Sequence, residues 1–239
     1  MSDKTVKGIV IKTAEVKEND LIITISTPEG LKSLYGRGLK KMTSKNAHAC
    51  QLLDCSEFLI EDSMSREILM MKSATLKKDF VNIKGDYDRL ALASVVAEIS
   101  SKLEDEDLFM LIFRTLDNLD RTKEPYTVFN LFVVEILNRL GIAPVVDGCV
   151  ICGEENGIET VSIADGGFIC RDCNSQTHIN PRDVNFLRRF RIINKATFDV
   201  LDKIYGIGLN DYEITAMLVE FLMTHSGMTL RSWRSVQHA

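Results

Sequence analysis

The sequence predicts an α+β protein, in which a small N-terminal β-barrel precedes a helical domain that carries a cysteine-rich insertion. Three observations predict this fold class. Short apolar and β-branched segments dominate residues 1–75, the apolar spacing becomes that of helices after Asp86, and two Cys-x-x-Cys pairs interrupt the helical part. We expect one domain at residues 1–80 and a second at residues 81–239, with the insertion at residues 145–178.

Five segments near the N-terminus have the length and composition of strands, and turn residues separate them. Thr27-Pro28-Glu29-Gly30 has Pro and Gly where a tight turn between the second and third strands needs them. Five strands in such a short span suit a closed barrel. The OB-fold is the five-stranded type that binds nucleic acid, and an SH3-like barrel is the alternative. The expected strands are Val6–Lys12, Leu21–Ser26, Leu31–Tyr35, Leu53–Ile60 and Glu67–Ser73.

Helical periodicity predicts three helices before the insertion and two after it. The third helix should begin near Pro125, which the first turn of a helix tolerates, and stop at Gly141. Acidic residues at 104–107 would suit the start of the second helix. Apolar stripes mark the first three helices, at Leu92/Val95/Val96/Ile99/Leu103, Leu108–Leu119 and Pro125–Leu140. Capping residues mark the starts of the last two, at Asn180–Asp183 and at Asn210–Asp211 before Ile214–Thr224.

The cysteine spacing is the most specific feature of the chain. Cys149 and Cys152 form one Cys-x-x-Cys pair, and Cys170 and Cys173 form another after 17 intervening residues, which is the spacing of a zinc ribbon. Four thiolates saturate Zn²⁺ tetrahedrally and leave no position for a catalytic water, so we expect one structural Zn²⁺ per chain. A redox role is an alternative for one pair alone, but it would not explain two. A short hairpin, residues 159–163 and 167–170, should join the pairs.

Composition narrows the function classes. The chain has 239 residues, and 45% of them are hydrophobic, a fraction that excludes intrinsic disorder. Its net charge of −5 gives the whole protein no general attraction for nucleic acid. It has no apolar run long enough for a membrane span and no secretory signal, so we expect a cytoplasmic protein with no membrane partner. Cys50 and Cys55 are expected to be buried core thiols.

Basic residues gather in two places. The stretch from Gly30 to Leu53 contains no Asp or Glu. It combines cations, which can neutralise phosphates, with Gly, Ser and Thr, which allow close backbone approach and hydroxyl contacts. A second cluster follows the ribbon. A solvated surface is the alternative for both clusters. The candidate DNA-binding residues are Lys32, Arg37, Lys40, Lys41 and Lys45 in the first cluster, and Arg188, Arg189 and Arg191 in the second.

No catalytic residues are expected. The four histidines have no spacing to Ser, Cys or Asp that indicates a triad, and the chain lacks a phosphate-binding Walker loop, a dinucleotide fingerprint and a zinc-protease helix. A binding protein is therefore favoured over an enzyme.

Several segments along the chain follow one another in a distinctive order: Gly8–Ile11, Glu18–Ile22, Thr27–Gly30, Tyr35–Gly38, Lys40–Lys41, Leu137–Pro144 before Cys149–Gly153, and Leu230–Ser235. Their order and spacing resemble those of the bacterial RecO family of recombination mediators. The match covers nearly the whole chain, although the acidic isoelectric point and Trp233 depart from the family pattern.

The resemblance implies an OB barrel, a helical domain and a four-cysteine zinc ribbon, with a non-enzymatic role in DNA repair. Family members bind single- and double-stranded DNA, anneal complementary strands, bind the C-terminal tail of single-stranded DNA-binding protein, and with RecR help load RecA onto coated DNA. The barrel cations and the four cysteines named above would then be the DNA and zinc sites. The alternative is a scaffold of a repair complex that binds little DNA itself.

Overall fold

The computed structural model describes residues 2–62, 67–103 and 108–237 and divides into two compact units. The first unit comprises residues 1–121 and 230–239, and the second comprises residues 122–229. The expected acidic start of the second helix, residues 104–107, and His238 lie outside the described residues. The predicted boundary between two domains after residue 80 stays a proposal, because compact units of a fold need not coincide with its domains.

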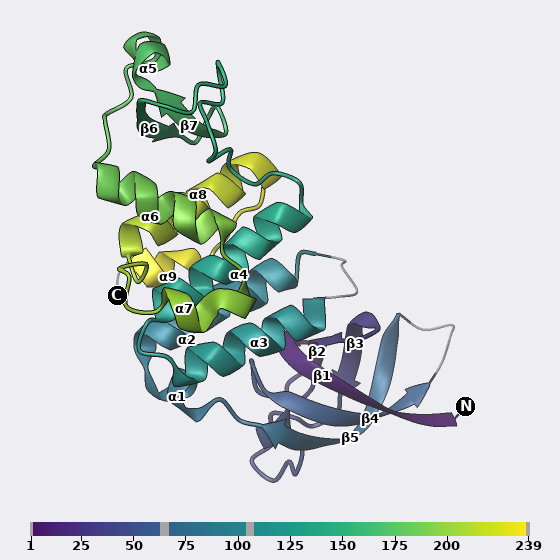
Figure 1. The fold of residues 1–239 in the computed structure, drawn as a ribbon. Helices are drawn as coiled ribbons and strands as arrows, with labels where there is room; N and C mark the ends of the chain where they lie inside the picture. The colour runs from purple at the N-terminus through teal and green to yellow at the C-terminus, as the bar shows by residue number, and fades with distance from the viewer. Residues whose placement is uncertain (1, 63–66, 104–107, 238–239) are drawn as a thin grey trace. The chain divides into compact units, whose positions relative to one another are not determined.

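A closed five-stranded barrel forms the N-terminal part of the first unit (Figure 1). Its strands follow the order β1-β2-β3-β5-β4, and β4 pairs back with β1. All the pairings are antiparallel except that of β3 with β5, which is parallel. The strands are β1 Ser2–Glu15, β2 Leu21–Thr27, β3 Gly30–Gly36, β4 Cys55–Asp62 and β5 Ile68–Lys78. The predicted α+β class with a five-stranded barrel of the OB type is confirmed.

Alternation along the strands fills the barrel. Ile23 and Ile25 of β2 point inward with Leu34 of β3, and all three side chains are fully buried. At the start of β3, Gly30 adopts a φ of 95°, which an L-residue rarely tolerates. The hydroxyl of Thr27 donates to the Gly30 carbonyl at 2.7 Å, so the predicted tight turn is present. Cys50 and Cys55 are buried, as predicted.

Among its described residues, the first unit also contains four α-helices: α1 Val81–Gly85, α2 Tyr87–Ser100, α3 Leu108–Arg121 and α9 Trp233–Gln237. The α1 and α9 helices are too short for a periodic signal and were not expected. Asp120 of α3 accepts hydrogen bonds from the amides of Asn82 and Ile83, which satisfies the first turn of α1. Trp233 is buried at 4% exposure, so the terminal motif of the sequence is a packing element of this unit.

The second unit is built on α4 Pro125–Arg139, α6 Val184–Lys195 and α8 Tyr212–Ser226. The side chains of Asp183 and Asp211 accept amide hydrogen bonds at the starts of α6 and α8, as the capping pattern predicted. Gly227 ends α8 with a φ of 71°. The smaller elements are η1 Ala47–Ala49 of the first unit, and η2 Phe198–Val200 and α7 Leu201–Ile204 of the second. Among the described residues, no helix is long and apolar enough to cross a membrane.

Candidate metal centre and nucleic-acid interface

The four predicted metal ligands come together. The sulfur atoms of Cys149, Cys152, Cys170 and Cys173 all lie within 4.8 Å of one another, and those of Cys152 and Cys170 are 3.7 Å apart. A tetrahedron with Zn–S bonds of about 2.3 Å has sulfur atoms roughly 3.8 Å apart. The donor set and its dimensions therefore fit a four-thiolate zinc site, so the cluster could hold a metal ion.

Backbone hydrogen bonds shape the first Cys-x-x-Cys turn. The amide of Gly153 donates to the carbonyl of Cys149 at 2.8 Å, and the amide of Cys149 donates to the carbonyl of Glu154 at 2.8 Å. Gly153 has a φ of 80°, so the turn needs a residue that tolerates the left-handed region. The amide of Val150 donates to the carbonyl of Phe168, which ties this turn to the strand that leads to the second pair.

A hairpin and a short helix supply the second pair. Strands β6 Ile158–Ser162 and β7 Gly167–Cys170 are antiparallel, and α5 Arg171–Thr177 follows directly. Cys170 is thus the last residue of β7, while Cys173 lies in α5. The predicted hairpin is present, but α5 was not expected because seven residues are too few to show a helical period.

The thiols of the cluster differ in how readily they ionise. Burial opposes ionisation of Cys149, but hydrogen bonds from the backbone amides of Cys170, Cys152 and Ile151 lower its pKa to about 6. The hydrogen bond with the Cys152 sulfur and burial raise the pKa of Cys173 above its ordinary value. A metal ion binds thiolates, so it would compensate the cost of ionising clustered sulfurs.

The ribbon is anchored within its own unit. Asn174 of α5 donates to the carboxylate of Glu159 at 2.8 Å and to the carbonyl of Ile179 at 2.9 Å. The ring of Phe168 lies 6.1 Å from that of Phe190 in α6. These contacts hold the cysteines on a packed platform rather than on a free loop.

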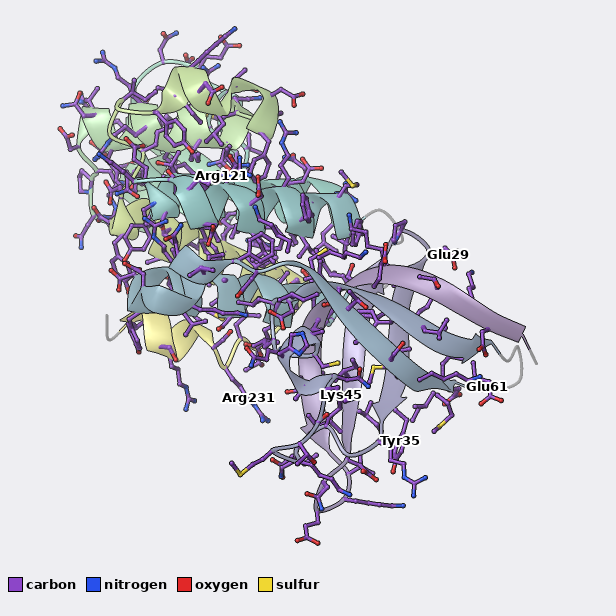
Figure 2. All side chains as sticks on the ribbon, turned by 90° about the horizontal axis from the view of Figure 1, so that it is seen from below. Glu29, Tyr35, Lys45, Glu61, Arg121 and Arg231 are labelled. Atoms are coloured by element: carbon purple, nitrogen blue, oxygen red, sulfur yellow. The ribbon has the colours of Figure 1, made fainter. Side chains whose placement is uncertain are left out.

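The cationic loop, defined here as residues 37–46, follows β3 at one end of the barrel. Figure 2 shows Glu29 and Tyr35 at opposite ends of β3, with Lys45 on the side of Tyr35. The loop turns through Gly38, whose φ is 66°. It lies against the connection between β1 and β2, since the amide of Lys40 donates to the carbonyl of Asn19 at 3.1 Å.

Asp20 organises the start of the cationic loop. Its carboxylate accepts a short hydrogen bond from the hydroxyl of Tyr35 and another from the amide of Gly38 at 2.7 Å. The hydrogen bonds from Tyr35 and Gly38 hold the pKa of Asp20 below its ordinary value and outweigh the desolvation that would raise it. The charges of Lys17 and Arg37 also lower this pKa. The other end is held by Asn46, whose side chain accepts from the amide of Ala74 in β5. Sequence reasoning missed both anchors, because the partners of Asp20 and Asn46 lie 15 or more residues away along the chain.

The five predicted barrel cations do not form one group. Arg37, Lys41 and Lys45 are exposed and make no ion pair with a described residue. Lys40 pairs with Glu15 at 2.7 Å. Lys32 lies near the opposite end of β3, where it pairs at 3.2 Å with Glu29, which also binds Lys4.

Two of the three arginines in the second predicted cluster form ion pairs. Arg189 pairs with Asp211 at 2.8 Å and donates to the carbonyl of Gly208. Arg191 pairs with Asp147 at 2.9 Å, and Lys195 binds the same carboxylate. Of the three arginines predicted in α6, Arg188 alone is exposed without an ion pair in the described part of the chain.

Comparison with known proteins covers both parts of the chain. Residues 1–80 match the family model described as Recombination protein O N terminal, and residues 84–234 match Recombination protein O C terminal. A DNA repair protein RecO from Caldanaerobacter subterraneus subsp. tengcongensis is 24% identical over 238 residues, which cover 95% of this chain and 94% of the relative. Proteins of that name from Bacillus cereus and Bacillus anthracis are 30% identical over 171 residues, 69% of this chain and 68% of each relative.

Proposed function

The chain belongs to the RecO family of DNA repair proteins, and from that premise we propose that it is a non-enzymatic recombination mediator that binds DNA through the cationic loop. It would bind single- and double-stranded DNA in the bacterial cytoplasm and anneal complementary strands. The single observation that supports this most directly is the set of exposed cations at Arg37, Lys41 and Lys45, none of which forms an ion pair with a carboxylate of the described chain.

The mechanism is electrostatic. Phosphates displace condensed counterions when they meet Lys and Arg, and this gain does not depend on sequence. Cations that hold two strands at once lower the repulsion between their phosphates, which lets complementary bases meet. Asp20 and Asn46 keep the loop in one arrangement, so little conformational entropy is lost when DNA binds.

Zinc would play a structural part in this function. We propose that Cys149, Cys152, Cys170 and Cys173 hold one Zn²⁺ per chain, since their sulfur spacing suits tetrahedral coordination. When bound, the ion would link the two Cys-x-x-Cys turns of a ribbon that is too small to have a core of its own. No protein group is activated by it in this proposal.

Membership of the RecO family is also the reason for proposing specific partner proteins. We propose that the chain binds the C-terminal tail of single-stranded DNA-binding protein and acts with RecR to help load RecA onto coated DNA. A scaffold of a repair complex with little DNA binding of its own is the second candidate, and the net charge of −5 favours it.

A titration across a salt series distinguishes the two candidates. Fluorescence anisotropy with two unrelated single-stranded oligonucleotides of equal length should give similar affinities, with log K falling linearly against log salt. Replacing Lys41 and Lys45 together by Ala should flatten that slope by about 1.4, at roughly 0.7 per cation. The matched control is Lys203→Ala, an exposed lysine of the second unit, which should leave the slope unchanged.

The same titration tests the second cluster. If α6 also meets DNA, Arg188→Ala should reduce the slope by about the amount of one cation. The scaffold candidate would be selected if the wild-type chain shows no binding at low salt while it retains a repair partner in a pull-down.

A further inference from the structure

The cationic loop carries one apolar side chain that points into solvent. Met42 is exposed at 104% of its reference area, the highest value among the exposed large hydrophobic side chains of the described residues. The other large apolar residue of the loop, Leu39, is buried at 4% and belongs to the barrel core. Leu39 fits closely there, because a Cβ atom at Gly36 would meet its side chain at 2.2 Å. The loop thus turns one apolar residue inward as an anchor and another outward.

The backbone places Met42 at the corner of a tight turn. The amide of Ser44 donates to the carbonyl of Lys41 at 2.9 Å, so Met42 and Thr43 are the central residues of a β-turn. The amide of Lys41 in turn donates to the carbonyl of Gly38 at 3.2 Å, which connects this turn to the one that Asp20 holds. Hydrogen bonds therefore fix the backbone that carries the exposed Met42 side chain.

Charge surrounds this apolar tip. Lys41 immediately precedes Met42 and Lys45 follows three residues later, and both are exposed without an ion pair to a described residue. Residues 30–53 contain no carboxylate. A ligand for this tip must accordingly bring anionic groups for the lysines and an apolar surface for the thioether within a few ångströms of each other.

We propose that Met42 inserts against an exposed base face when the flanking lysines bind phosphates, so that the loop prefers DNA with unstacked bases to an intact duplex. This inference rests on the proposed DNA-binding function. A nucleotide presents phosphate and base at the required separation, and methionine is among the apolar side chains that wedge between base steps. Its polarizable sulfur also makes favourable contacts with aromatic rings. A single exposed side chain offers too little apolar area to bind a membrane surface firmly.

The test uses oligonucleotides that contain 2-aminopurine, whose fluorescence rises when the base unstacks. The full-length chain should increase this fluorescence at saturation, and Met42→Leu, which keeps an apolar tip, should retain the increase. Met42→Gln should lose most of it and bind single-stranded DNA about fivefold more weakly, the scale of one lost stacking contact. Because no charge is removed, the salt slope of Met42→Gln should equal that of the wild type. Equal melting temperatures would show that the variants are folded.

The outcomes separate this inference from the proposed function. Salt-dependent DNA binding with the same fluorescence increase in Met42→Gln would overturn the wedge and leave the DNA-binding function standing. Absence of any DNA binding by the wild type at low salt would overturn both. Binding to vesicles of anionic lipid that depends on Met42, with no effect of the substitution on DNA, would also overturn the wedge.

Discussion

The carboxylate of Glu98 should contribute stability that depends strongly on pH. It accepts hydrogen bonds from the amides of Arg231 and Ser232 at 3.0 and 2.8 Å, and from the Ser232 hydroxyl at 2.5 Å. It thereby holds the start of α9 against α2, within the first unit. Burial opposes ionisation, but these hydrogen bonds and Lys102 lower the pKa of Glu98 from 4.5 to about 2.

The magnitude follows from the difference between the folded and unfolded pKa. A depression from 4.5 to about 2 corresponds to about 3 kcal/mol of folding free energy, present when the pH is above the unfolded pKa. As the pH falls through the folded pKa, the carboxylate is protonated in both states and this stability is lost. By about pH 3, more than half of it should be gone.

Urea denaturation of the wild type and Glu98→Gln at pH 7 and pH 3 measures this contribution. The variant should be less stable at pH 7 by up to about 3 kcal/mol, and the difference should shrink to roughly 1 kcal/mol at pH 3. Glu220→Gln is the control, since Glu220 is exposed and unpaired among the described residues. A loss of stability in Glu98→Gln that is the same at both pH values would refute the reasoning.

Three further predictions concern the metal cluster, the helical core and the cationic loop. Metal analysis should find about one zinc per chain, lost in Cys173→Ser and retained in Cys55→Ala; retention by both variants would contradict the four-thiolate site. Asn130→Leu should stabilise the protein by about 1 kcal/mol in urea denaturation, because neither polar atom of this fully buried amide has a hydrogen-bond partner in the described chain. Asp20→Ala should bring the pKa of Tyr35 back toward 10.0 in an NMR titration, since the hydrogen bond with Asp20 is the main cause of its elevation.

Sequence reasoning predicted what depends on local patterns. Alternation and turn residues predicted all five barrel strands, and the helical period predicted α3 and α4 nearly to their ends. Boundaries were less accurate where the backbone departs from a regular form. The fourth strand was expected from Leu53, but Leu53 has a φ of 74°, so β4 begins at Cys55.

The metal cluster was predictable for the same reason. The Cys-x-x-Cys spacing fixes which sulfurs can meet, and a hairpin of the expected length brings the second pair to the first.

The charged residues could not be sorted in the same way. In the sequence, nothing but membership of a basic cluster distinguishes Lys41, and the same holds for Lys32, Arg189 and Arg191. In the structure, each of the latter three forms an ion pair with a carboxylate from a turn or a distant segment. Such pairs depend on tertiary packing, which charge density along the sequence does not report. The role of Asp20 was hidden for the same reason, since its partners are 15 and 18 residues away.

Strand annealing tests the central claim most directly. Two complementary oligonucleotides that carry a donor and an acceptor dye would be coated with the cognate single-stranded DNA-binding protein and mixed with the chain across a salt series. We expect the chain to accelerate annealing, and we expect this acceleration to decline as salt increases and to be smaller in the Lys41→Ala/Lys45→Ala double variant. Annealing that is no faster with the chain than without it, at any salt concentration, would contradict the mediator function.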